Sequence, residues 1–505
     1  MSKNKRRSQK HKSDPTRSAL RSIESIYILG AGPAGMATAM ELSKAGKTAT
    51  IVERDSRVGG LAQTLEFKEG DLVFRTDIGP HRFFSKNQYL YDFIEDLLDE
   101  KWIRVPRQTR QLIEGKYYDY PIKALQAFKN IGPLRAVKMV ASYGVGAVQY
   151  RVFNRPVESF QDYIVANFGY ELGKFNMLNY TEKIWGVSCK QLHPDWARQR
   201  IKGLNLTTAL KSALFGGGAK QAKTLVDEFY YPQYGTGLIY ETIRERITNA
   251  GFSFHMESEP TKIEHEHGRI TRVTLNTPDG EKTIEPDTLV SSIPITHFMS
   301  LLDPAPPAAV LEALAGLSWR AQVYLFVTLD REKVTDDNWI YIPDSDVPVG
   351  RIAEMKNFST DMCPEGKTSL FLEFFVTEGD EVWNMSKEEL FEVAMKDMER
   401  LGLFTRDEVR NYYHIKRRHV YPVYDLGYPE RLAVVKEYLD TFTNLYYIGR
   451  PGRFKYNNQD HSIEMGIAAA RGLVQGERPD FDSIGGEQEY FEKGKLAEEK
   501  SVKAG

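Results

Sequence analysis

The feature that most constrains this chain is a glycine-rich loop near its start, Gly30-Ala31-Gly32-Pro33-Ala34-Gly35. It follows the apolar run Ile26–Leu29, which is typical of a buried parallel strand. The segment Met36–Ala45 after it has the pattern of a helix, and a second strand-like run, Ala49–Glu53, ends in an acid. Strand, glycine loop, helix, strand and terminal acid together predict a Rossmann-type β-α-β unit that binds a dinucleotide.

Each glycine of this loop has its own physical role. Gly30 permits the tight turn, Gly32 lets the backbone approach a pyrophosphate, and Gly35 allows the helix to pack closely on the strand. Pro33 and Ala34 lie in this loop, and the N-terminus of the helix that follows presents free N–H groups to the phosphates. Glu53 lies where a carboxylate accepts hydrogen bonds from ribose hydroxyls.

Length, charge and cysteine content narrow the class of protein. The chain has 505 residues, too many for one compact core, so we expect several structural units. The formal net charge of -2 gives no reason to expect nucleic acid or a membrane as the main partner. The two cysteines, Cys189 and Cys363, are too few for a Cys-based metal site or a disulfide framework. We therefore predict no metal site and a reducing, cytoplasmic location.

The two ends of the chain are rich in charge. The first 22 residues carry eight Lys/Arg and one acid without an apolar segment, which predicts a solvated, disordered basic tail and no secretory signal. The alternative role for this tail is an electrostatic contact with nucleic acid or with acidic lipid, the latter as a weak peripheral membrane contact. Residues 481–505 are predicted to be a second loose tail. No run of eighteen uninterrupted apolar residues exists, so we expect no transmembrane helix.

Two further segments indicate that the dinucleotide is FAD. Arg54 follows the acid directly, and Gly59-Gly60-Leu61 comes soon after it, so a second stretch of chain passes near the phosphates. Near the other end, the apolar run Asn444–Ile448 leads into Gly449-Arg450. This pattern resembles the flavoprotein superfamily of amine oxidases, protoporphyrinogen oxidases and UDP-galactopyranose mutase, in which the C-terminal strand returns to the flavin. Neither cysteine has a context that suggests covalent attachment, so noncovalent FAD is expected.

The remaining pattern predicts an α/β fold in which a Rossmann-type FAD-binding domain carries an inserted helical region and an antiparallel substrate-covering sheet. The FAD-binding domain is expected to be discontinuous, from residues 23–100, 235–300 and 440–480. Residues 101–234 are predicted to form a mostly helical insertion, because apolar residues recur at spacings of three and four. Residues 301–439 are predicted to form the substrate domain, in which 321–329 and 368–376 have the pattern of strands.

Five segments in the same order resemble UDP-galactopyranose mutase. They run through about residues 25–478 and read Gly79-Pro80-His81-Arg82-Phe83-Phe84, Tyr180-Thr181-Glu182-Lys183-Ile184-Trp185-Gly186, Val349-Gly350-Arg351, Tyr421-Pro422-Val423 and Gly449-Arg450-Pro451-Gly452-Arg453-Phe454-Lys455-Tyr456-Asn457-Asn458-Gln459-Asp460. In the mutases, N5 of the reduced flavin attacks the anomeric carbon of a nucleotide-activated sugar. The nucleotide diphosphate leaves, and the sugar ring opens and recloses in another size. NAD(P)H is needed there only as the reductant that primes the flavin.

The resemblance implies a role for each matching residue. His81 lies against the flavin ring, and Arg351 holds the substrate diphosphate, so these two are the candidate catalytic residues. Tyr421 and Tyr456 donate to the same phosphates, Tyr180 borders the nucleotide base, and Trp185 walls the sugar pocket. A second phosphate-binding arginine is expected after Trp185, and the spacing leaves both Arg198 and Arg200 open. Arg450 is expected on the FAD pyrophosphate, and Asn458 and Gln459 at the pyrimidine end of the flavin.

Some positions differ from the mutase pattern, and they keep other functions open. Phe84 replaces the second histidine of the mutase loop, and Asn458 replaces an aspartate. The alternative function is that of an FAD oxidoreductase, similar to amine oxidases or protoporphyrinogen oxidase, which dehydrogenates a small organic substrate. A flavin-binding structural or regulatory protein is a third hypothesis. Arg351 also has a purely structural alternative, as the ion-pair partner of Glu354, and His81 one as a loop-capping histidine.

Overall fold

A computed structural model describes residues 25–485 apart from 86, 121, 123 and 201–227. The basic tail predicted over residues 1–22 therefore lies outside the described residues, as do most of the second tail and part of the predicted helical insertion. Among the described residues, no helix is both long and apolar enough to cross a membrane.

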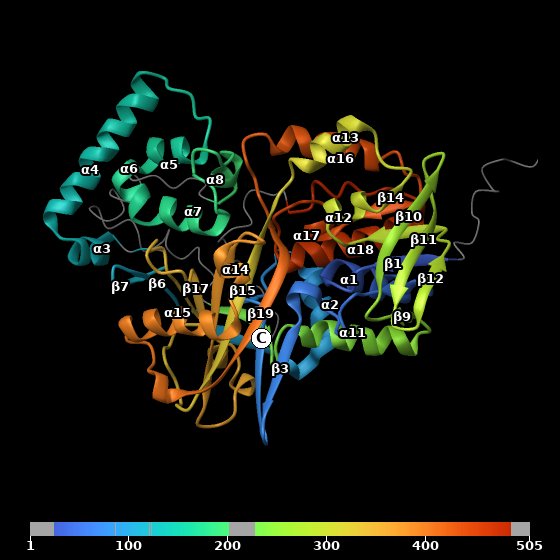
Figure 1. Cartoon of the computed structure of the whole chain (residues 1–505), viewed down its shortest axis with the longest axis horizontal. Helices are drawn as coiled ribbons and strands as arrows, with labels where there is room; N and C mark the ends of the chain where they lie inside the picture. The colour runs from blue at the N-terminus through green and yellow to red at the C-terminus, as the bar shows by residue number, and fades with distance from the viewer. Residues whose placement is uncertain (1–24, 86, 121, 123, 201–227, 486–505) are drawn as a thin grey trace, which may run out of the picture.

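A five-stranded sheet, parallel throughout, forms the centre of the FAD-binding part (Figure 1). Its order is β20-β13-β1-β2-β9, with β1 at Ile26–Leu29, β2 at Thr50–Val52, β9 at Ser253–His255, β13 at Thr288–Ser291 and β20 at Leu445–Tyr447. The chain thus supplies these strands from three distant segments. The predicted β-α-β unit and the returning C-terminal strand are confirmed.

Four helices share one hydrophobic core with this sheet: α1 (Pro33–Lys44), α2 (Gln88–Leu98), α11 (Gly237–Asn249) and α18 (Gln459–Gln475). The contact between α1 and α18 is close because two small residues face each other there. A Cβ atom on Gly466 of α18 would lie 2.2 Å from the carbonyl oxygen of Ala34. This contact fixes the N-termini of α1 and α18 relative to each other, which is what the site requires.

A second core lies behind the parallel sheet and joins it to a smaller sheet and to several helices. The smaller sheet has the order β12-β11-β10-β14, in which β10-β11-β12 is an antiparallel meander and β14 pairs in parallel with β10. The bounds are β10 Glu259–Glu266, β11 Arg269–Thr277, β12 Gly280–Ile284, β14 Leu302–Asp303, α12 Ile295–Ser300, α13 Ala308–Ala315 and α16 Tyr428–Leu439.

The substrate-domain sheet has seven strands in the order β19-β15-β18-β17-β16-β6-β7. The bounds are β15 Trp319–Leu329, β16 Trp339–Tyr341, β17 Arg351–Glu354, β18 Thr368–Val376, β19 Val409–Pro422, β6 Thr109–Ile113 and β7 Lys116–Asp119. Helix α15 (Lys387–Arg400) shares a core with one face, and the hairpin of β3 (Thr64–Glu69) and β4 (Leu72–Asp77) shares a core with the other. The sheet is antiparallel as expected, except that β16 and β6 pair in parallel.

Within the described part of the segment predicted as a mostly helical insertion, 101–234, the helices lie between residues 124 and 200. Its helices are α3 (Ala124–Ile131), α4 (Pro133–Ala147), α5 (Phe160–Phe168), α6 (Tyr170–Leu172), α7 (Asn179–Trp185) and α8 (Asp195–Arg200). The ends are strands: β5 (Trp102–Pro106) pairs with β8 (Glu228–Pro232), while β6 and β7 extend the substrate-domain sheet. Short runs rich in aromatic and β-branched residues fit the periodicity of a helix as well as that of a strand. Here they form strands because they pair with strands that are distant in sequence.

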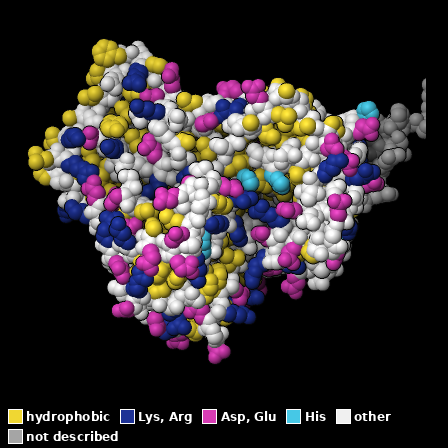
Figure 2. Space-filling view, viewed as in Figure 1, with side chains coloured by type: hydrophobic (Ala, Val, Ile, Leu, Met, Phe, Trp, Pro, Cys, Tyr) yellow, Lys and Arg dark blue, Asp and Glu magenta, His cyan; other side chains and the backbone are white. Residues whose placement is uncertain are grey.

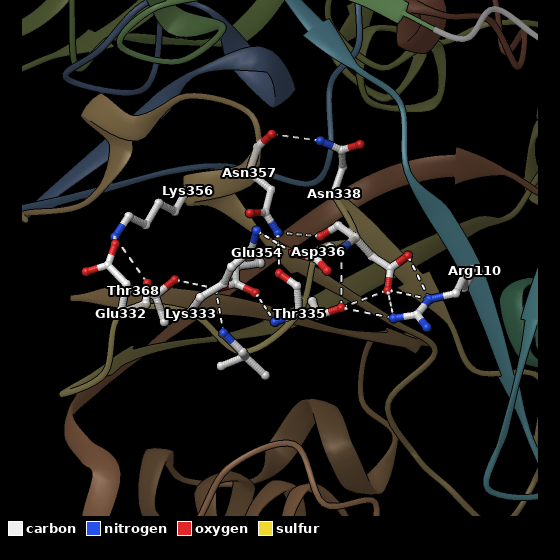
Figure 3. Close-up of polar contacts among 12 residues, drawn as sticks. Arg110, Glu332, Lys333, Thr335, Asp336, Asn338, Glu354, Lys356, Asn357 and Thr368 are labelled. Atoms are coloured by element: carbon white, nitrogen blue, oxygen red, sulfur yellow. Dashed lines mark hydrogen bonds and ion pairs between the residues drawn. The ribbon is translucent and has the colours of Figure 1, made fainter. Parts of the chain in front are cut away.

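A polar network ties β6 to the strand that carries Arg351 (Figure 3). The Glu354 carboxylate accepts hydrogen bonds from the backbone N–H groups of Val334 and Thr335 at 2.9 and 2.7 Å. Arg110 on β6 donates to both carboxylate oxygens of the fully buried Asp337. Buried carboxylates with several donors of this kind rigidify their surroundings. The network therefore fixes β17, which begins with Arg351 and ends with Glu354.

Candidate active site

One large cavity opens where the five parallel strands end. The chain that follows each strand contributes to its wall: Gly30–Ala34 after β1, Glu53–Asp55 after β2, Ser258–Pro260 after β9, Ser292–Pro294 after β13 and Gly449–Pro451 after β20. A crevice at the carboxyl edge of a parallel sheet is where α/β proteins bind dinucleotides. All the residues that the sequence predicted for FAD line this cavity except Gly35 and Gly59.

The glycine loop has the geometry that its sequence predicts. Gly30 has a φ of +95°, and a Cβ on Gly35 would lie 2.0 Å from the carbonyl oxygen of Gly30. Gly35 therefore acts by close helix–strand packing and faces away from the cavity. A Cβ on Gly32 would meet nothing within 4 Å, because this residue faces the open cavity. That empty cradle at the N-terminus of α1 suits a phosphate group.

The paired glycines and the returning strand close on this loop. Gly59 has a φ of +105° and its N–H donates to the carbonyl of Ala31 at 2.8 Å. A Cβ on Gly60 would lie 3.2 Å from the Cα of Gly32, and one on Gly449 would lie 3.0 Å from the Cβ of Ala34. Gly59 shapes the turn without lining the cavity, while Gly60 and Gly449 line it.

Glu53 holds the loop as well as lining the cavity. Its Oε2 accepts from the N–H of Ala31 at 2.7 Å and its Oε1 from the N–H of Asp55 at 2.9 Å. Burial raises the pKa of this carboxyl, while the two backbone N–H groups oppose that rise. The lone pairs that remain can accept from ribose hydroxyls. Arg54 also lines the cavity, with Asp55 4.0 Å away.

A second helix N-terminus faces the cavity. Asn458 is the N-cap residue of α18, and Gln459, Asp460 and Ser462 line the cavity with it. Gln459 Oε1 is buried without a hydrogen-bond partner among the described residues. Burial also raises the pKa of Asp460 well above its ordinary value. Two helix N-termini, an open glycine cradle and an unpaired buried amide fit the phosphates and the polar ring edge of FAD.

His81 lies between the cavity and the substrate domain. Its Nε2 is 2.9 Å from the carbonyl oxygen of Leu61 and 3.0 Å from that of Ile78. Because both neighbours only accept, this nitrogen carries the proton. Burial lowers the pKa of His81 to about 4, with Arg450 and Arg351 adding to the effect. The ring is therefore neutral near pH 7. It caps the loop as a structural histidine would, and it also lines the cavity.

Arg351 pairs with Glu373 rather than with Glu354. In the register of β17 and β18 the two residues lie directly opposite each other, with Arg351 Nε and Nη2 donating to the two carboxylate oxygens at 2.6 Å each. Glu354 is three positions from Arg351 along one strand, so it points to the opposite face, and the alternative pairing is wrong. Gln322 Nε2 also donates to Glu373, at 3.0 Å. No described residue accepts a hydrogen bond from Nη1 of Arg351.

Aromatic residues surround this arginine. Tyr421 stacks on Tyr456 with ring centroids 5.5 Å apart, and Tyr180 packs edge-on against Tyr341 at 5.4 Å. Burial raises the pKa of Tyr421 to about 12 and that of Tyr180 well above its ordinary value, although Arg351 opposes both shifts. Both phenols therefore stay protonated near neutral pH. Neither hydroxyl makes a hydrogen bond to the part of the chain that the structure describes.

Arg450 links the cofactor cavity to the tyrosines. Its guanidinium lies 5.4 Å from the ring centre of Tyr421 and 5.0 Å from that of Tyr456, and it also lines the cavity. Its Nε donates to the carbonyl of Asn457 at 2.9 Å and its Nη1 to that of Val420 at 3.3 Å. In this structure its side chain donates to backbone carbonyls, and its positive charge lies at the cavity wall.

Trp185 lies behind the tyrosines and is not among the residues that line the cavity at the edge of the parallel sheet. Only 1% of its surface is exposed, and its ring contacts Trp196, Tyr421, Tyr424 and Tyr456. A large aromatic residue at a helix end is as suited to packing as to binding, and here packing decides. Arg198 and Arg200 lie on α8, but their side chains are outside the described set, so the choice between them stays open.

The structure adds cavity residues that the sequence analysis missed. They follow β9 and β13, or lie on α12 and at the end of β19: Ser258, Glu259, Pro260, Ser292, Ile293, Pro294, His297, Arg417, Arg418 and His419. The residues after β9 and β13 have no sequence motif, and only the strand order shows that they follow neighbouring parallel strands, whose carboxyl ends meet at one edge. Near the middle of the face shown in Figure 2, histidine side chains lie beside Lys and Arg side chains.

Known proteins similar to this chain include both mutases and oxidases. The probable UDP-galactopyranose mutase of Klebsiella pneumoniae is 22% identical over 173 residues, 34% of this chain and 43% of that protein. The L-amino-acid oxidase of Demansia vestigiata is 19% identical over 477 residues, 88% of this chain and 86% of the oxidase. The solved structure of a reduced UDP-galactopyranose mutase superposes with a TM-score of 0.78 at 21% identity, covering 92% of this chain and 96% of that one.

At these identities the structural likeness shows a shared fold and no specific reaction. The sequence itself matches the family of flavin containing amine oxidoreductases over residues 33–434, most of its length. The matched region includes α1, the cavity wall up to β19 and the whole substrate-domain sheet. The chain therefore belongs to the flavin containing amine oxidoreductase family, whose flavin cofactor, FAD, fits the cavity at the carboxyl edge of its parallel sheet.

Proposed function

We propose that this flavoenzyme acts on a sugar carrying a nucleotide diphosphate, as an intramolecular transferase that changes the size of the sugar ring. The observation that carries the proposal is the unpaired Nη1 of Arg351, beside two protonated tyrosine hydroxyls, next to the FAD cavity. A diphosphate is a compact dianion that needs several donors at once. Arginine guanidinium groups and tyrosine hydroxyls supply several hydrogen-bond donors to a diphosphate, which a single acid–base pair does not.

Glu373 determines which edge of Arg351 remains for the substrate. It occupies Nε and Nη2, so the guanidinium presents Nη1 and keeps a fixed orientation. Tyr180 and Tyr421 lie within electrostatic reach of the same guanidinium. These donors would bind the diphosphate and stabilise the charge that grows on it as it leaves. Arg450 adds a second positive charge between this group of donors and the cofactor cavity.

Reduced FAD, when bound, supplies the nucleophilic N5 for such a reaction. The chain's own residues have positioning roles. His81, neutral and held by the carbonyls of Leu61 and Ile78, gives the cavity wall a fixed polar group without adding charge. We also propose that NAD(P)H serves as reductant, that the FAD is noncovalent and that the protein works in the cytoplasm.

Oxidation of a small organic substrate is the second candidate, favoured by family membership and by the full-length similarity to an L-amino-acid oxidase. The charge of the site favours the mutase. An amine substrate would bring a cation towards Arg351 and Arg450, which repel it. A carboxylate-bearing amine would be oriented with its acid group on Arg351, so amino acids are the oxidase substrates to test.

The test compares both reactions on the holoprotein. Dithionite-reduced enzyme is incubated with UDP-hexoses, and the products are separated by anion-exchange chromatography. Oxidised enzyme is incubated with amines and amino acids while oxygen consumption is followed. We expect a new UDP-hexose isomer only with reduced enzyme. Arg351→Lys, which keeps the charge but loses the planar fork, should raise KM more than about tenfold with the flavin spectrum unchanged. Oxygen consumption without isomerisation would refute the mutase.

A further inference from the structure

The outer face of helix α4 and of the π-helical turn after it (Val148–Val152) carries an unusual set of exposed apolar side chains. Most of the strongly exposed large apolar residues of the described chain lie here. They are Leu134 (88% exposed), Val137 (68%), Val140 (50%), Val145 (59%), Val148 (44%), Val152 (67%) and Phe153 (76%). We call this set the α4 patch. It exceeds the scattered single apolar residues of an ordinary protein surface.

The patch has helical spacing. Leu134, Val137, Val145, Val148 and Val152 follow one another at intervals of three, eight, three and four residues, and the exposed Ala141 divides the interval of eight. They therefore form one stripe along the helix. The opposite face is the packed one: Met139 is buried, and a Cβ on Gly146 would lie 2.4 Å from the carbonyl oxygen of Val165. One face of α4 holds the helix to the protein, and the apolar outer face has no cover among the described residues.

Position and shape leave this face accessible. Figure 1 shows α4 at the outer edge of the molecule, at the opposite end from β1 and β9 of the parallel sheet. Figure 2 shows apolar side chains together with Lys and Arg side chains at the same end. A flat surface that approached from this side would meet α4 first and leave the cavity free.

The charge around the patch has a single sign along the chain. Residues 120–157 contain six Lys/Arg and no Asp or Glu. Three of these cations have acidic partners elsewhere: Arg135 with Glu114, Lys138 with Glu171, and Arg155 with Asp162. Lys129 and Arg151 make no ion pair with any described residue. An apolar stripe on a segment that also carries cations, two of them without an acidic partner among the described residues, is the pattern of a helix that lies in the headgroup region of an anionic bilayer.

We propose that the α4 patch is a peripheral docking surface for an anionic lipid bilayer, into which the stripe inserts while Lys129 and Arg151 contact the headgroup phosphates. A second copy of the chain fits less well, because a second α4 stripe would supply no acidic residue for Lys129 and Arg151, since residues 120–157 contain none. Anionic headgroups supply the counter-charges for both. The proposal concerns where the enzyme works and is independent of which reaction it catalyses.

Flotation of the full-length holoprotein tests the proposal. Vesicles of phosphatidylcholine alone are compared with vesicles that also contain phosphatidylglycerol. The patch variant is Leu134→Ser, Val145→Ser and Phe153→Ser together. The matched control is Leu311→Ser with Leu426→Ser, two apolar residues exposed by 41% and 45% on other elements. We expect wild type and control to float with anionic vesicles and the patch variant to bind at least about tenfold more weakly.

Two further measurements make the result decisive. Phe153→Trp keeps an apolar ring, so its fluorescence should be quenched by lipids brominated along the acyl chain. Lys129→Gln with Arg151→Gln should weaken binding and reduce its dependence on salt. Lack of flotation, or equal flotation of patch variant and wild type, would overturn the proposal. So would a patch variant that changes from dimer to monomer by light scattering while no protein binds vesicles, because the patch would then join two copies.

Discussion

The buried ion pair between Arg351 and Glu373 gives a quantitative test of the site. Both residues lie on the same face of neighbouring antiparallel strands, joined by two hydrogen bonds of 2.6 Å. The Glu373 side chain is fully buried, whereas 17% of the Arg351 side chain is exposed. The change to make is Glu373→Gln, which keeps the volume of the side chain and removes its charge.

The expected loss of unfolding free energy follows from the hydrogen-bonding groups that remain after the substitution. Three N–H donors now converge on Glu373, two from Arg351 and one from Gln322. A glutamine offers one oxygen and one NH2 group there, so at least one donor faces another donor. Removing one member of a buried pair costs about 3–5 kcal/mol. Because Arg351 keeps some solvent contact, we expect about 3 kcal/mol for Glu373→Gln. We expect about 4 kcal/mol for Arg351→Met, which leaves a fully buried carboxylate unpaired.

The double variant separates the pair from its surroundings. If the two residues act as a pair, the double variant Arg351→Met with Glu373→Gln should lose less unfolding free energy than the sum of the losses of the two single variants. We expect the difference to be at least about 2 kcal/mol. Urea unfolding at saturating FAD, followed by flavin fluorescence and circular dichroism, measures all four proteins. The matched control is the exposed pair of Arg406 and Glu392, where Glu392→Gln should cause no measurable change. Additive single effects would refute the pairing argument.

Two other predictions concern the glycine loop and a buried acid. Gly32→Ala should fold normally but bind FAD at least about tenfold more weakly in a fluorescence titration, because its Cβ would enter the open cradle. Gly35→Ala should instead destabilise the fold itself, since its Cβ would lie 2.0 Å from a carbonyl oxygen. Equal effects of the two substitutions would contradict the roles assigned to these glycines. Burial raises the pKa of Asp77 from 3.8 to about 6, so its stabilising contribution is present below about pH 4 and lost as the pH rises through 6. Relative to Asp77→Asn, wild type should therefore lose about 3 kcal/mol of unfolding free energy between pH 4 and 7 in urea titrations, and a constant difference would contradict this shift.

Local chemistry explains why so much of the cofactor site was predictable. A positive φ at Gly30, close packing at Gly35 and a carboxylate at the end of the second strand are requirements that short segments must meet by themselves. The sequence therefore predicted the β-α-β unit, the second glycine pair and the return of Gly449 and Arg450. The residues after β9 and β13 carried no motif of their own and became recognisable only when the strand order was known.

The helical insertion shows where periodicity alone fails. Residues 102–119 have short apolar and aromatic runs that fit a helix or a strand. Their state was decided by partners far away in sequence: β5 pairs with β8, and β6 with β16. The predicted helices between 124 and 185 needed no such partner to be recognised, because their spacing of apolar residues continues over several turns.

By itself, the sequence determined that this chain binds a dinucleotide, that the dinucleotide is FAD, and that tyrosines and arginines of the right kind recur in mutase-like order. Only the tertiary structure decided how those side chains are used. Glu373 is 22 positions from Arg351, and the strand register places it opposite that guanidinium, so that one edge is occupied and the other open. The same packing placed Trp185 behind the tyrosines and left the α4 patch uncovered. A sequence motif reflects the local requirements of a backbone turn. Ion pairs and exposed faces depend instead on which distant strands and helices become neighbours.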